Sequence, residues 1–140
     1  MNTYFTTAKN FCAWAESLKS LTEVNAPAII VKIMDIYIAS SSLEYPPETE
    51  GIEYQYDAVR LNFTANQFNT YWETQTPYDC KDPICGSLYD DLTSIYNDVR
   101  EGVILFEQGY CSEATWQWKW NFENHWKYHA VDAIRALNSL

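Results

Sequence analysis

Apolar side chains recur at helical spacing over most of the chain. In residues 5–21 one face would hold Phe11, Trp14, Leu18 and Leu21, and spacing of this kind is typical of an amphipathic helix. Residues 26–41 are apolar nearly all round, which predicts a second helix in a central position. Asn25 can cap that helix, and Pro27 suits its first turn, where a missing N–H costs little.

The clearest periodicity covers residues 54–72, between two proline-containing loops at 43–51 and 76–86. Apolar positions there fall at i, i+4, i+7, i+11, i+14 and i+18, namely Tyr54, Ala58, Leu61, Ala65, Phe68 and Trp72. This pattern predicts an amphipathic helix of roughly five turns. Glu73, which follows it, is then expected to be an exposed acid at the helix end, with membership of a carboxylate cluster as the alternative.

Two more helices complete the prediction. Ser87, with Asp90 three residues later, can cap a helix that runs to about Gln108, and Gly109 can end it. The last helix should open at Ser112 and continue close to the C-terminus. The predicted fold is therefore all-α, one domain over residues 1–140, and a single bundle of about five helices.

The charge balance narrows the function. The 140 residues include 9 Lys and Arg against 19 Asp and Glu, a formal net charge of −10, and no basic patch offers a site for nucleic acid. No segment is long and apolar enough to span a membrane, and none resembles a signal peptide, so we expect a cytoplasmic protein. Its four cysteines, Cys12, Cys80, Cys85 and Cys111, are then expected to be free thiols without a disulfide.

The last helix carries a polar stripe on the side away from its apolar face. A helical wheel places both histidines of the chain, His125 and His129, on this stripe together with Trp118 and Asp132. On the preceding helix, Asp91 and Asp98 border the apolar face, and Gly102 lies on the same flank, where a close helix approach would explain the glycine. If these helices pack antiparallel, the aspartates face the histidines.

Three interpretations of this set remain open. The carboxylates can accept hydrogen bonds from the imidazoles in a structural polar network. Alternatively, His125 and His129 can bind a divalent ion with one or two of Asp91, Asp98 and Asp132. In the third interpretation the stripe is a partner-binding surface with Trp118 as its aromatic anchor. The network is favoured, because it pairs polar groups that burial would otherwise leave unsatisfied. The metal signal is weak, since the ferritin-like Glu-x-x-His pairs are absent and two histidines four residues apart are a common arrangement, so no bound cofactor is expected.

The second half of the chain resembles an uncharacterised, mostly bacterial family known as a domain of unknown function. The resemblance rests on a Tyr-Trp-Glu, a Gly-Ser-Leu, an Asp-Asp-Leu…Ile-Tyr-x-Asp helix and a His-Trp-x-x-His-Ala helix. In this sequence these elements are Tyr71–Glu73, Gly86–Leu88, Asp90–Leu92 with Ile95, Tyr96 and Asp98, and His125–Ala130 with Ala133 and Arg135–Leu137. The resemblance implies a compact helical domain and transfers no activity.

Neither a nucleophile motif nor a phosphate-binding glycine loop is present in the sequence. Together with the negative charge and the many aromatic residues, this favours a non-enzymatic module that binds a protein partner, one of basic character in particular. Small acidic proteins that neutralise toxins or regulate other proteins share the profile. The alternative is a metal-dependent enzyme that uses the His/Asp set of the last two helices.

Overall fold

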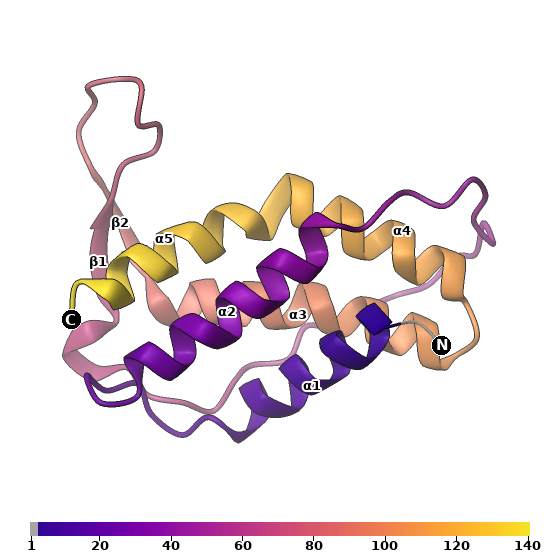
Figure 1. Ribbon diagram of the computed structural model, residues 1–140, viewed down its shortest axis with the longest axis horizontal. Coiled ribbons are helices and arrows are strands. Elements are labelled where there is room, and N and C mark those ends of the chain that lie inside the picture. The colour runs from indigo at the N-terminus through magenta and orange to yellow at the C-terminus, as the bar shows by residue number, and fades with distance from the viewer. Residues whose placement is uncertain (1–2) are drawn as a thin grey trace.

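The computed structural model describes residues 3–140 and confirms an all-α architecture, with a small hairpin added to it (Figure 1). Helix α3 contacts α1, α4 and α5, and α2 lies against α5. Helices α4 and α5 form one interrupted helix, joined by the π-helical turn η2. The bounds are α1 Thr3–Ser17, α2 Ala26–Ser41, α3 Leu88–Glu107, α4 Cys111–Asn121, η2 Phe122–Trp126 and α5 Lys127–Asn138.

The ends of α3 follow the sequence closely. The Ser87 hydroxyl accepts a hydrogen bond from the Asp90 backbone N–H at 3.2 Å, and Gly109 adopts a left-handed φ of 93° directly after the helix. The start of α4 differs from the expected cap at Ser112. The carboxylate of Glu50 accepts the N–H groups of Ser112 and Glu113 at 3.1 and 2.6 Å, so a distant loop residue caps this helix.

The helix expected at 54–72 is wrong. Residues 54–65 run extended along α3, and Leu61, Phe63 and Ala65 are buried at alternating positions. The side chain of Asn97 from α3 accepts from the backbone N–H of Val59 and donates to its C=O, both at 2.8 Å. This pairing satisfies both backbone groups of Val59 without a helix.

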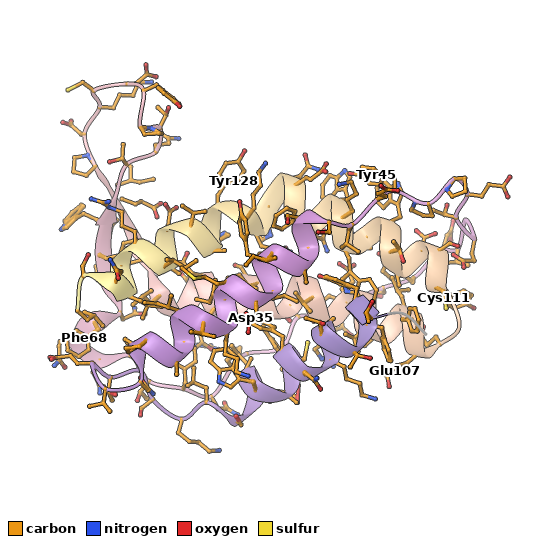
Figure 2. The ribbon with its side chains drawn as sticks, in the orientation of Figure 1. Asp35, Tyr45, Phe68, Glu107, Cys111 and Tyr128 are labelled. Carbon is orange, nitrogen blue, oxygen red and sulfur yellow. The ribbon has the colours of Figure 1, made fainter. Side chains whose placement is uncertain are left out.

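A two-stranded antiparallel hairpin follows the short 3-10 helix η1 (Asn66–Phe68). Its strands are β1 (Thr70–Glu73) and β2 (Ile84–Ser87), which pair Thr70 with Ser87 and Glu73 with Ile84. The loop of residues 74–83 projects away from the helices (Figure 1), and its side chains extend into open space (Figure 2). Within residues 3–140, no helix combines the length and apolar character needed to cross a bilayer.

Candidate functional site

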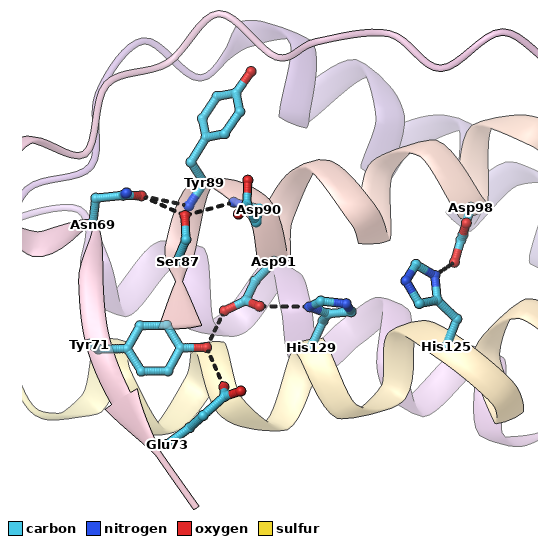
Figure 3. Close-up of polar contacts among 10 residues, drawn as sticks. All are labelled: Asn69, Tyr71, Glu73, Ser87, Tyr89, Asp90, Asp91, Asp98, His125 and His129. Atoms are coloured by element: carbon cyan, nitrogen blue, oxygen red, sulfur yellow. Dashed lines mark hydrogen bonds and ion pairs between the residues drawn. The ribbon is translucent and has the colours of Figure 1, made fainter. Parts of the chain in front are cut away.

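The two histidines of the last helix face α3 and contact its aspartates, as the antiparallel packing predicted. His125 Nδ1 lies 2.6 Å from Asp98 Oδ2, and His129 Nδ1 lies 2.7 Å from Asp91 Oδ1 (Figure 3). Asp91 is buried at 4% exposure. The carboxylate of Asp91 raises the pKa of His129 above its ordinary value, so this imidazole favours its charged form.

The hairpin reaches the same cluster through Tyr71. Its hydroxyl makes a short hydrogen bond to Asp91 and lies 3.1 Å from Glu73 Oε2 (Figure 3). A Cβ at Gly86, the cross-strand partner of Tyr71, would lie 2.5 Å from the phenol ring. Only glycine therefore allows the ring to lie across β2 with its hydroxyl over the acids.

Asp132 completes this group from α5. Burial together with the nearby Glu73 and Asp91 carboxylates raises the pKa of Asp132 to about 7. Burial likewise raises the pKa of Asp91, more than its hydrogen bonds with His129 and Tyr71 lower it. In the described part of the chain, neither Glu73 nor Asp132 forms an ion pair with a lysine or arginine.

Two open grooves meet at Glu73 and Asp132. One of about 850 Å³ runs between β1 and the end of α5, and one of about 640 Å³ lies between the hairpin loop and the start of α5. Exposed apolar and aromatic side chains surround them, including Trp72, Tyr78, Ile84, Tyr128 and Val131. Figure 2 shows Tyr128 on the outer side of α5. The carboxylates therefore lie within an aromatic surface.

Trp118 is not part of any exposed surface, so its expected role as a partner anchor is wrong. It is 1% exposed, and its indole N–H donates to the Val99 carbonyl at 2.8 Å. A Cβ at Gly102 would overlap the indole ring, which confirms the close approach expected at this glycine. The helical wheel failed because the π turn η2 adds about one residue to the turn, which rotates α4 relative to α5.

The remaining candidate groups are the four cysteines and the possible metal ligands. Cys12 is buried, Cys80, Cys85 and Cys111 are exposed, and all four are free thiols. Among residues 3–140 no three or more His, Cys, Asp or Glu side chains are arranged to hold a metal ion. The carboxylate oxygens of Asp91 and Asp98 instead form hydrogen bonds with the imidazole Nδ1 atoms of His129 and His125.

The profile of a family described as a domain of unknown function, DUF5063, matches residues 2–140. The chain belongs to this family. Among solved structures, this chain is similar to protein BF1032 from Bacteroides fragilis. The two share 20% sequence identity and a TM-score of 0.72, and the match covers 97% of this chain and 91% of that one. At this identity the likeness shows the shared fold. No curated protein matches the chain.

In this DUF5063 chain the cluster is larger than the sequence indicated. His129, Asp91 and Asp132 were predicted to lie together, whereas Tyr71 and Glu73 were assigned to a helix end. The prediction of an exposed acid at Glu73 is wrong. A period-two pattern across Tyr71 and Glu73, opposite a glycine in the next apolar segment, is the signal that a hairpin interpretation would have used.

Proposed function

We propose that this protein is a non-enzymatic interaction module that binds an extended, basic segment of a protein partner along β1. The observation that supports this most is the pair of carboxylates Glu73 and Asp132, which lies at the junction of both grooves and forms no ion pair with a lysine or arginine of the described chain. A lysine or arginine from a partner would form charge-assisted hydrogen bonds with these carboxylates.

The shape of the groove supports an extended partner. Among the described strands β1 pairs with β2 alone, which leaves its other edge unpaired, and residues Thr70–Thr74 line the larger groove. An unpaired strand edge binds an added strand through backbone hydrogen bonds, while pockets select alternate side chains. Trp72, 71% exposed, and Tyr128, 62% exposed, supply apolar contact on either side.

The net charge of −10 supports the choice of a basic partner, because it speeds the encounter with a cationic surface. A module that covers a basic segment would neutralise or regulate the protein that contains it. We place this activity in a bacterial cytoplasm, where the exposed thiols would stay reduced.

Selection of random peptides displayed on phage tests the proposal. We expect peptides rich in Lys and Arg, with a synthetic copy that binds the wild type and loses affinity when alternate backbone nitrogens are methylated. Trp72→Ser and Asp132→Asn should each weaken binding about tenfold or more, equal to about 1.4 kcal/mol. Val24→Ser, at a 90% exposed position in the α1–α2 connection, is the matched control and should leave binding unchanged.

Three outcomes would contradict the proposal. These are selected peptides without a basic bias, affinity that does not fall with added salt, and equal binding by the Trp72 and Val24 variants. A second copy of the chain is the competing occupant of the β1 edge. Sedimentation equilibrium detects it as a dimer that Trp72→Ser dissociates, and that result would replace the peptide proposal.

A further inference from the structure

The two imidazoles also face each other. Their ring centroids lie 5.0 Å apart at an interplanar angle of 82°. Each Nδ1 contacts an aspartate, and Figure 3 shows the second nitrogen of each ring on the edge that faces the other ring. The structure thus directs two Nε2 atoms into one space.

The aspartate carboxylates determine whether each Nε2 atom has a lone pair for a ligand. An Nδ1–H that donates to a carboxylate leaves the Nε2 of a neutral imidazole with a lone pair. This carboxylate–histidine arrangement is the usual outer shell of metal-bound histidines, because it orients the ring and increases its basicity. Here it occurs twice, from Asp98 to His125 and from Asp91 to His129.

The separation of the rings fits chelation of one ion. Zn–N bonds measure about 2.0–2.1 Å, and the ring centre lies about 1.1 Å beyond the nitrogen, so each centroid would be about 3.2 Å from the metal. Two such ligands at a tetrahedral angle of about 109° give centroids about 5.2 Å apart, close to the 5.0 Å observed. The four-residue spacing on one helix matches the two histidines of H-E-x-x-H zinc sites.

We propose that His125 and His129 bind one borderline divalent transition ion, such as Zn²⁺, Ni²⁺ or Cu²⁺, through their Nε2 atoms. Asp98 and Asp91 orient the rings and are not ligands. No third protein ligand is arranged among the described residues, so water occupies the remaining positions. The 48% and 31% exposure of the two side chains leaves room for it. This site does not depend on the groove proposed above to bind a peptide.

The decisive experiment is a Zn²⁺ titration by calorimetry. The chain should lack an affinity tag and contain serine at Cys80, Cys85 and Cys111, because these exposed thiols would bind Zn²⁺ themselves. We expect one ion per chain, weaker binding as the pH falls because protons compete for imidazole, and shifts of the Nε2 resonances of both histidines in ¹⁵N NMR spectra.

Four variants separate ligands from orienting residues. His125→Gln and His129→Gln should each abolish stoichiometric binding, and Asp98→Asn should lower the affinity 10–100-fold. Glu123→Gln removes an acid from the same π turn and should change nothing. Melting curves confirm that each variant is folded, and His125→Gln, at a half-exposed position, tests the site even where His129→Gln destabilises the chain.

Two results would overturn the site. One is the absence of stoichiometric binding of Zn²⁺, Ni²⁺ and Cu²⁺ at millimolar concentration. The other is Zn²⁺ binding that survives loss of either histidine, which would assign the ion to surface carboxylates. Neither result bears on peptide binding in the groove, so the two proposals fail separately.

Discussion

The two histidine–aspartate contacts have nearly equal lengths and very different surroundings. The N–O distance is 2.7 Å for His129–Asp91 and 2.6 Å for His125–Asp98. The Asp91 side chain is 5% exposed and also accepts from Tyr71, whereas the Asp98 side chain is 18% exposed and has His125 as its one hydrogen-bond partner in the described chain. The imidazoles follow the same order, with His129 31% and His125 48% exposed. Because solvent weakens an exposed pair, His129–Asp91, the inner contact, should contribute far more to stability than His125–Asp98, the outer contact, although their lengths are nearly equal.

The largest expected difference concerns the acids. Asp91→Ala leaves the partly buried imidazole of His129 without its acceptor and leaves the Tyr71 hydroxyl with Glu73 alone, and should lower the free energy of unfolding by about 3 kcal/mol. Asp98→Ala should cost about 0.2–1 kcal/mol. Urea denaturation of both variants measures the difference. Equal losses would show that distance alone describes these contacts.

The imidazoles should follow the same order with smaller effects. His129→Ala removes a donor from a buried carboxylate and should cost about 1–3 kcal/mol. His125→Ala should cost about 0.2–1 kcal/mol. A double-mutant cycle for each pair isolates its coupling energy. A larger coupling at His125–Asp98 would reverse the comparison.

The Tyr71 hydroxyl donates a hydrogen bond to Asp91 of the inner contact, and the outer contact has no such donor among the described residues. Its removal therefore tests the difference between the two contacts. Tyr71→Phe keeps the ring on Gly86 and removes one donor to Asp91, so it should lower stability by about 1 kcal/mol. Tyr78→Phe, at a position 96% exposed, is the control and should leave the melting temperature unchanged. A neutral Tyr71→Phe would indicate that His129 alone satisfies the carboxylate.

The inner cluster should also show a pH dependence. The pKa of Asp132 is about 7 in the folded chain, above its ordinary value of 3.8. The folded state therefore keeps a proton that the unfolded state releases, and stability falls as the pH rises from about 4 to about 7. Asp132→Asn should flatten this part of the profile relative to the wild type. An unchanged slope in chemical denaturation across that range would contradict the assignment.

The sequence was sufficient to predict the structure where the local pattern and the tertiary packing agree. The boundaries of α3 followed from Ser87 and Gly109, and the meeting of its aspartates with the histidines followed from helical spacing and a short connection. The extended segment was missed because Leu61 and Ala65 also fit helical spacing, and Asn97, which holds the backbone at Val59, is 38 residues away.

The position of Trp118 was missed for a different reason. A π turn has no strong local signal, yet its extra residue changes which side chains of α4 face α3. The hairpin was missed because its pairing depends on Gly86, whose role appears only when the ring of Tyr71 is placed over it. The first error comes from a local irregularity of the helix and the second from a contact between distant residues, and regular spacing within one segment encodes neither.

The loop of residues 74–83 stands clear of the helical body (Figure 1). A segment that packs against so little of the helical body tolerates changes of length and sequence, since each doubling of the length of a flexible loop costs only about 0.6 kcal/mol. Changes in the sequence of this loop would therefore leave the helices beneath it undisturbed. The same freedom makes it the place to insert a fluorophore or an engineered recognition sequence.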